Sequence, residues 1–165
     1  MDREDRRSVS REYFSQERLA EHHFRSFNNF LDRGMQDVVD EKETIGTDIG
    51  DKEGQEPVWV ELGDVRILTP RVREADGSEE LLYPQEARLR NITYAAPVFM
   101  EMSIVRGGEE EPEEVVDQTE TKVGRMPIMV GSNKCNIDGF SDEELIDIGE
   151  DPVDPGGYFI VNGSE

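Results

Sequence analysis

The stretch Gly156–Glu165, GGYFIVNGSE, determines how the rest of the chain must be interpreted. Tyr158–Val161 is an uninterrupted apolar run, partly aromatic and β-branched, which predicts a strand covered on both faces. Asn162-Gly163 follows directly and is a strong hairpin signal, because a type I′ turn needs positive φ at both central residues. A hairpin also needs a returning strand, and only two residues follow this turn. Either the turn is idle, or the sequence is a segment of a larger protein.

The composition is that of a folded acidic domain. The 165 residues are 35% hydrophobic and 35% charged, and the apolar residues cluster into runs, so the chain is long enough to bury a core. We expect residues 1–14, which are strongly charged, to form a flexible tail and residues 15–165 to fold. No apolar window approaches the ~18 residues of a membrane span, no secretory signal is present, and Cys135 is the single cysteine. These features predict a cytoplasmic protein with no membrane partner.

The charge is the most unusual property of the composition. The formal net charge is -21, from 39 acidic and 18 basic residues, and only four of the basic residues are lysine. Such surfaces suit very high salt, where the Debye length falls to ~3 Å and carboxylate repulsion is screened. A halophilic source is therefore our leading explanation, with an ordinary acidic protein as the alternative. The same charge argues against non-specific binding of nucleic acid by this chain alone.

A long helix is predicted near the start of the chain. Apolar residues recur at helical spacing between residues 15 and 40, with Ser15 as the N-cap and Gly34 as a candidate break between two helices. The residues on this face are Ala20, Phe24, Phe27, Leu31, Met35 and Val38. We interpret the face as core packing, with a docking face for a partner helix as the alternative.

Strands dominate the middle of the chain. Val58–Leu62 and Val65–Leu68 alternate around Gly63-Asp64, which predicts a β-hairpin with a type II′ turn. A long strand is expected over residues 98–105, and another within residues 121–130. The acidic residues from about 107 to 120 are predicted to form a solvated loop.

Local signals predict three further elements. Asp76-Gly77 marks a turn, and Pro84–Leu89 is expected to be a short helical element. Ser141 followed by Glu144 at N3 is a capping box, which predicts a short helix ending near Gly149. Helices followed by mostly antiparallel strands give the class α+β.

No stretch of the sequence forms a self-contained active site. His22 and His23 are adjacent, so on a helix they do not face one metal ion together. Asn136–Phe140 and Asp48–Asp51 lack the ligand spacing of a calcium loop and are interpreted as turns. Cys135 has no positioned base beside it and is interpreted as a packing residue.

The segment Pro84–Tyr94 differs from its acidic surroundings because it carries two arginines, Arg88 and Arg90, between apolar anchors. Arginine forms forked hydrogen bonds to carboxylate or phosphate. Arg88 and Arg90 are therefore candidates either for internal ion pairs, for example with Glu86, or for contact with nucleic acid or another subunit.

Four stretches resemble, in order, the N-terminal part of the second-largest subunit of archaeal and eukaryotic multisubunit RNA polymerases. They are SFNNF (residues 26–30) with MQDVV (35–39), LYPQEARLRNITY (82–94), RMPIMV (125–130) with Ser132 and Cys135, and GGYFIVNGSE (156–165). The acidic, lysine-poor surface is similar to the haloarchaeal version, in which this subunit is split and its N-terminal half is called B″. The resemblance implies that residues 15–165 are the first segment of the α+β protrusion domain, which a later segment of the family completes.

The resemblance also implies a function in DNA-templated transcription. The segment would form part of a wall of the DNA cleft, with DNA, the remainder of the second-largest subunit, the largest subunit and general initiation factors as partners. Magnesium belongs to the full polymerase and is bound by other segments, so no catalytic or metal-binding residue is implied here. Two hypotheses from the residues alone stay beside this one: a free-standing acidic module that binds a basic protein, and a metal-dependent enzyme built on His22 and the Asp-rich loops.

Overall fold

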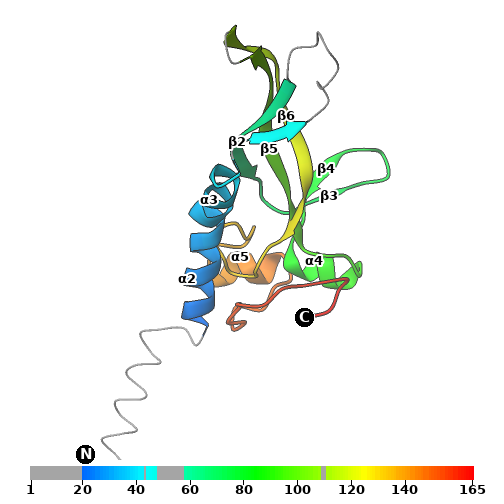
Figure 1. The fold of residues 1–165 in the computed structure, drawn as a ribbon. Helices are drawn as coiled ribbons and strands as arrows, with labels where there is room; N and C mark the ends of the chain where they lie inside the picture. Colours follow the sequence, from blue (N-terminus) through cyan, green and yellow to red (C-terminus); the bar gives the residue numbers. More distant parts are fainter. Residues whose placement is uncertain (1–19, 43, 48–57, 109–110) are drawn as a thin grey trace, which may run out of the picture. The chain divides into compact units, whose positions relative to one another are not determined.

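The computed structural model describes residues 20–42, 44–47, 58–108 and 111–165 (Figure 1). The expected tail, the Ser15 cap and the Asp48–Asp51 turn lie outside these residues. The fold is α+β, as predicted. It divides into two compact units, which we call the first unit (Met1–Asn29, Thr69–Ala95 and Pro127–Glu165) and the second unit (Phe30–Leu68 and Ala96–Met126).

In its described residues, the first unit combines three short helices with a two-stranded sheet. The helices are α2 (Glu21–Asn29), α4 (Pro84–Leu89) and α5 (Asp142–Asp147). Strands β3 (Arg71–Arg73) and β4 (Glu79–Leu81) pair antiparallel around the predicted Asp76-Gly77 turn, where Gly77 has a φ of 90°. The expected helix at Pro84–Leu89 and the capping box of α5 are both confirmed.

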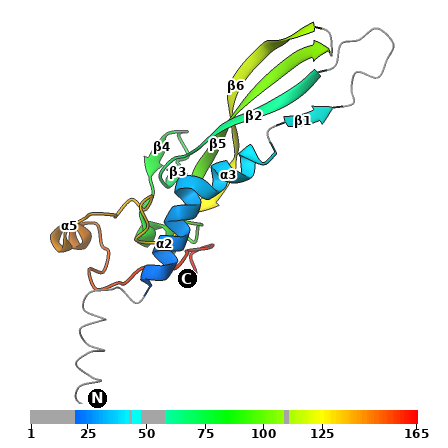
Figure 2. The ribbon, with the colours of Figure 1, turned by 60° about the vertical axis from the view of Figure 1, so that its left-hand side comes forward.

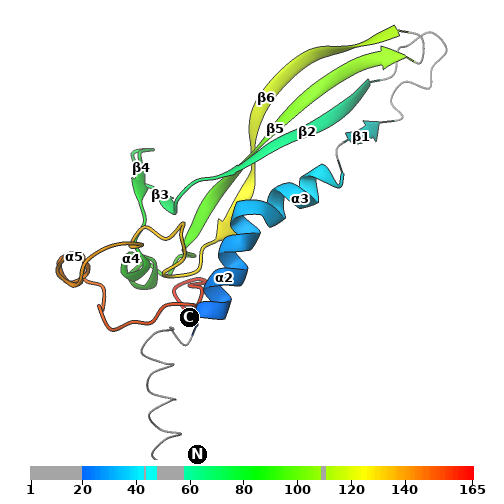
Figure 3. The same cartoon turned by 90° about the vertical axis from the view of Figure 1, so that its left-hand side faces the viewer.

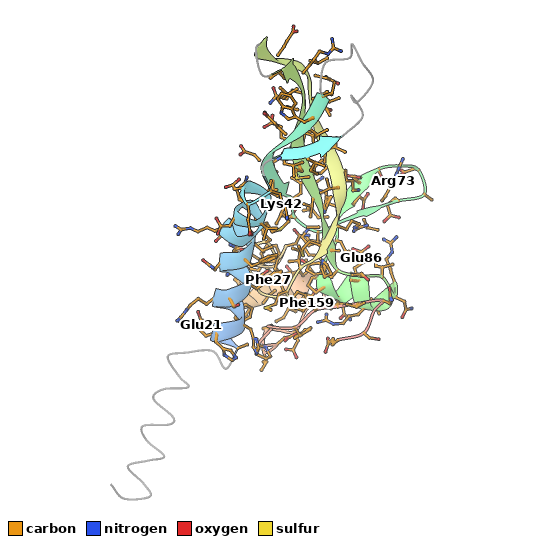
Figure 4. All side chains as sticks on the ribbon, viewed as in Figure 1. Glu21, Phe27, Lys42, Arg73, Glu86 and Phe159 are labelled. Atoms are coloured by element: carbon orange, nitrogen blue, oxygen red, sulfur yellow. The ribbon has the colours of Figure 1, made fainter. Side chains whose placement is uncertain are left out.

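The core of the first unit gathers apolar side chains from all of its segments. Its most completely buried large side chains include Leu82, Tyr94, Ile128 and Ile160. The rings of Phe27 of α2 and Phe159, both labelled in Figure 4, meet edge to face with centroids 5.2 Å apart. Residues far apart in the sequence therefore close one core.

The terminal stretch is extended but is not a regular strand, so that expectation was wrong for Tyr158–Val161. Single backbone hydrogen bonds hold it: the Tyr94 N–H donates to the Ile160 carbonyl at 3.0 Å, and the Val130 N–H donates to the Tyr158 carbonyl at 2.9 Å. Because its neighbours supply only these separate bonds, no continuous ladder forms. Ile160 is buried, whereas Val161 is 49% exposed.

The Asn162-Gly163 turn is confirmed. Asn162 and Gly163 have φ values of 50° and 79°, as a type I′ turn requires, and Val161 and Ser164 exchange backbone hydrogen bonds of 2.8 and 3.0 Å. The turn packs on Asn91, since a Cβ at Gly163 would stand 2.8 Å from the Asn91 Cα. The turn therefore packs against the end of α4 and the residues after it, and is not idle.

The second unit is a four-stranded antiparallel sheet with helical turns. The strands are β1 (Thr44–Thr47), β2 (Val58–Ile67), β5 (Ala95–Gly108) and β6 (Glu111–Pro127), of which Ala95 and Pro127 lie in the first unit. Their order is β1-β2-β5-β6, so β1 and β6 are the two edges (Figure 2). A π-helical turn, η1 (Phe30–Gly34), and helix α3 (Met35–Asp40) precede the sheet.

The predicted hairpin at Gly63-Asp64 is wrong, because β2 runs straight through these residues. Gly63 lacks the positive φ that a II′ turn requires. Instead, the register against β5 shifts between Leu62 and Val65, so one extra residue is taken up as a β-bulge. Gln36 of α3 supports the bulge: its Oε1 accepts from the Val65 N–H at 2.8 Å.

The acidic loop expected over residues 107–120 is also wrong. Most of this segment belongs to β5 and to the seventeen-residue strand β6. Carboxylates are tolerated in β6 because it is an edge strand, and its described residues 114–125 are exposed. The acidic composition predicted a loop. The β-branched residues that stand among the acids, Val115, Val116 and Thr119, favour a strand instead.

The apolar helical face is correct in its first half only. Phe24 and Leu31 are buried, as predicted, but Val38 is 59% exposed and its neighbour Val39 is half-buried. The wider turn η1 precedes α3 and rotates the following positions relative to an uninterrupted α-helix. Gly34 lies at the junction of η1 and α3.

Candidate functional site

Arg88 lies at the centre of the main charged cluster in the first unit. Its side chain projects from α4 toward residues that follow α5, and only 19% of that side chain is exposed. The residues in direct hydrogen-bond contact with its guanidinium group, together called the Arg88 cluster, are Gln85, Glu150, Asp154, Tyr158 and Glu165.

The guanidinium group is satisfied at each of its nitrogen atoms. Its Nε donates to Glu165 Oε1 at 2.7 Å, and its Nη1 donates to Glu150 Oε2 at 3.2 Å. Its Nη2 donates to the Tyr158 hydroxyl at 2.5 Å. The Tyr158 hydroxyl in turn donates to Asp154, which also lies 3.5 Å from Nη2. The cluster is therefore a closed network in which one cation holds three carboxylates.

The end of α5 places Glu150 in this network. Gly149 adopts a φ of 83°, and the Glu150 N–H donates to the Leu145 carbonyl at 2.8 Å, which is the Schellman pattern at a helix C-terminus. The Glu150 side chain is only 4% exposed. Its Oε1 accepts from the backbone N–H of Gln85 at 2.6 Å, so one carboxylate joins the first turn of α4 to Arg88.

The protonation states of the cluster follow from its packing. Burial by itself would lower the pKa of Arg88, but the hydrogen bonds with Glu165 and Glu150 outweigh it and raise the pKa above its ordinary value. Burial, together with the hydrogen bond to Asp154, raises the pKa of Tyr158. Arg88 is thus a permanent cation and Tyr158 a neutral donor.

A concavity of about 630 Å³ opens beside the cluster. It is lined by Arg88, Tyr158 and the carboxylates of the cluster, together with Val153 and Pro155. Because the positive charge is already paired, the concavity does not offer a free cation to a phosphate group.

Arg90, the second arginine predicted from the sequence, lies apart from the Arg88 cluster. Its Nη1 donates to Glu74 at 2.6 Å and to Glu86 at 2.7 Å. These hydrogen bonds are the main cause that raises the pKa of Arg90. Both arginines therefore form internal ion pairs, including the predicted pair with Glu86.

A buried polar group surrounds Tyr94. Its hydroxyl lies 3.3 Å from the Cys135 Sγ and accepts from the Asn136 N–H at 2.9 Å. The Asn136 side chain donates to the carbonyls of Pro70 and Leu82 at 2.8 and 2.7 Å. Burial is the main cause that raises the pKa of both Tyr94 and Cys135. Cys135 is thus a buried neutral thiol in a structural network.

Several of these residues were missed from the sequence. Glu150, Tyr158 and Asn136 carry no local signal for their roles, although the capping box and Gly149 did indicate where α5 would end. His22 and His23 lie side by side with ring centroids 4.0 Å apart. Within the described ranges, no three His, Cys, Asp or Glu side chains are grouped as a metal site would need. None of the described helices is both long and apolar enough to span a membrane.

The Arg88 cluster and the buried group around Tyr94 and Cys135 both join segments that are distant in the sequence, so both hold the first unit together. Comparison with known proteins identifies the class and the family. The chain belongs to the RNA polymerase beta subunit family, whose model matches residues 18–165.

Named relatives cover nearly the whole chain. It is 83% identical to the DNA-directed RNA polymerase subunit Rpo2N of Halobacterium salinarum over 98% of its length. It is 42% identical to Rpo2N of Methanothermobacter thermautotrophicus over 93%, and 44% identical to Rpo2 of Saccharolobus shibatae over 98%. The chain spans only 31%, 28% and 13% of these relatives, respectively.

Proposed function

We propose that this chain is part of a multisubunit DNA-directed RNA polymerase and works as a structural segment of its second-largest subunit. The observation that carries the proposal is the family match over residues 18–165, joined to relatives that are named as subunits of this enzyme. Its partners would be the remainder of the second-largest subunit, the largest subunit and initiation factors. Magnesium would act in the assembled enzyme through residues of other segments.

The finer part of the proposal is that the segment forms a wall of the DNA cleft and has no active site of its own. The internal pairing of Arg88 and Arg90 supports a structural role for both, because their donors already bind carboxylates. DNA contact would then fall to other exposed basic residues, such as Arg73 on β3 and Lys122 on β6. Arg73 is labelled in Figure 4.

Affinity purification tests membership of the polymerase. The protein is tagged in its source cells and purified at the salt concentration of the cytoplasm. We expect the other polymerase subunits in stoichiometric amounts. Recovery of the protein without them would refute the proposal and favour the free-standing acidic module.

Two further measurements test the finer part. A photocrosslinking residue at position 73 or 122 in the assembled enzyme should crosslink to bound template or non-template DNA, and a residue at the half-buried position 39 serves as the control. No DNA crosslink from either exposed position would refute the cleft-wall role while leaving the assembly intact. The isolated chain should synthesise no RNA, and synthesis by it alone would refute the absence of an active site.

A further inference from the structure

Among the strands that the structure describes, β6 presents a long edge that no other strand covers. The sheet order places it beside β5 only, whereas the other edge strand, β1, has four residues against the seventeen of β6 (Figure 3). Successive residues of an edge strand direct their backbone N–H and C=O groups alternately toward the neighbouring strand and away from it. The outward groups of β6 are therefore available to pair with another strand.

The side chains of β6 are also suited to a strand partner. All residues from 114 to 125 are exposed, and the aliphatic ones are far from buried: Val115 is 58%, Val116 50% and Val123 47% exposed. Valine and threonine favour cross-strand pairs with β-branched neighbours. An additional strand would cover these side chains as well as pair the backbone.

Charge determines which partner the edge accepts. Residues 111–121 of β6 include five acids and no base, and the two bases of the strand, Lys122 and Arg125, follow them. Glu120 is bound by Arg66 at 2.7 Å, but Glu114 and Asp117 form no salt bridge within the described residues. Like charges placed opposite each other destabilise a strand pair, so a second copy of this edge is repelled. The acidic stretch 111–121, which ends before Lys122, also repels nucleic acid.

We propose that β6 binds an extended, lysine- or arginine-rich segment of a partner protein, which joins the sheet as a fifth strand. Backbone hydrogen bonds supply the affinity, and basic side chains opposite Glu114 and Asp117 supply the register. This inference goes beyond the proposed function, because it rests on the second unit alone and holds whichever assembly contains the chain.

A valine- and threonine-rich peptide with two lysines three residues apart tests the proposal, because Glu114 and Asp117 lie on opposite faces of β6 and a strictly alternating peptide would place its lysines on one face only. Hydrogen–deuterium exchange of the full-length protein is measured by mass spectrometry with and without the peptide. We expect slower exchange in residues 114–125, and no change in α4 or α5. The same peptide with methylated backbone nitrogens should give no protection, because its strand edge cannot pair.

Matched variants separate pairing from general attraction to an acidic protein. Glu114→Gln with Asp117→Asn removes two charges from β6, and Asp138→Asn with Glu143→Gln removes two exposed charges from the first unit. Loss of two cross-strand charge pairs should weaken peptide binding about 2- to 30-fold, whereas the control pair should leave it nearly unchanged.

Three outcomes would overturn the proposal. They are absence of protection in β6, equal protection by the methylated peptide, and equal weakening by the two variant pairs. Protection of residues 114–121 by a duplex DNA, or by the same peptide with glutamate in place of lysine, would contradict the charge argument specifically.

Discussion

Replacing Arg88 by methionine tests whether the Arg88 cluster stabilises the first unit. Methionine has an unbranched apolar side chain that replaces the aliphatic part of arginine, and the substitution removes the cation. Glu150, whose side chain is 4% exposed, then keeps the hydrogen bond from the Gln85 N–H and loses the one that Arg88 donates to its Oε2. A buried carboxylate without its counter-ion is the main source of the expected loss.

The magnitude follows from the burial of each pair. Removing one member of a buried ion pair costs about 3–5 kcal/mol. The Arg88 side chain is 19% exposed and opens on a concavity, so we take the lower end, about 3 kcal/mol. The pair with Glu165, whose side chain is 52% exposed, adds a few tenths of a kcal/mol at most.

Urea unfolding at constant KCl measures this free energy. Amide hydrogen exchange in residues 84–89 reports the unfolding of the first unit, which contains Arg88. Trp59, the single tryptophan, lies in the second unit, so its fluorescence reports the unfolding of that unit separately. We expect loss of protection in residues 84–89. Arg90→Met on the same helix is the control, and its effect should be much smaller because Arg90 is exposed.

The charge itself is tested by the double variant Arg88→Met with Glu150→Gln. Without either charge, about half or more of the lost free energy should return. An Arg90→Met loss as large as that of Arg88→Met, or no recovery in the double variant, would refute the buried-charge explanation.

Three other predictions concern stability. Gly156→Ala should cost more than about 2 kcal/mol, because Gly156 has a φ of 66° and a Cβ would stand 2.6 Å from the Val130 carbonyl oxygen; Gly139→Ala, with no atom within 4 Å, should cost about 1 kcal/mol, and equal costs in urea unfolding would contradict the close contact. Burial raises the pKa of the Cys135 thiol. The neutral thiol therefore contributes fully to the free energy of unfolding below the ordinary thiol pKa of about 8.5, and this contribution is lost as the pH rises through the higher pKa of the folded protein. Thiol titration near pH 8 should therefore find Cys135 unreactive until urea is added, and rapid reaction of the folded protein would refute this. Because the net charge is -21, the thermal midpoint should rise as KCl increases from about 0.1 to 1 M; a fall would count against carboxylate repulsion.

Local signals in the sequence predicted local structure well. Helix α4, the Ser141 capping box and the Asn162-Gly163 turn each depend on residues within four positions of one another, and each is confirmed. Predictions that needed the neighbouring strand were less successful. Gly63-Asp64 has the composition of a turn, but pairing with β5 and support from Gln36 make it a bulge.

The candidate site shows the same division. The sequence identified Arg88 and Arg90 as unusual, and left open whether their partners were carboxylates or phosphates. The Arg88 partners Glu150, Asp154 and Glu165 lie 62, 66 and 77 residues further along the chain, so no spacing rule could identify them. Their selection depends on how α5 and the terminal stretch pack against α4.

The sequence by itself therefore determined the α+β class, the family resemblance, the short helices and the turns, because these follow from residue type and short-range backbone preference. The tertiary structure alone decided that the acidic residues from Glu111 onward form an edge strand, that both arginines are internally paired, and that the terminal stretch packs without a ladder. The physical reason is that each of these depends on which distant groups become neighbours, and hydrogen-bond partners and burial are properties of the packed chain.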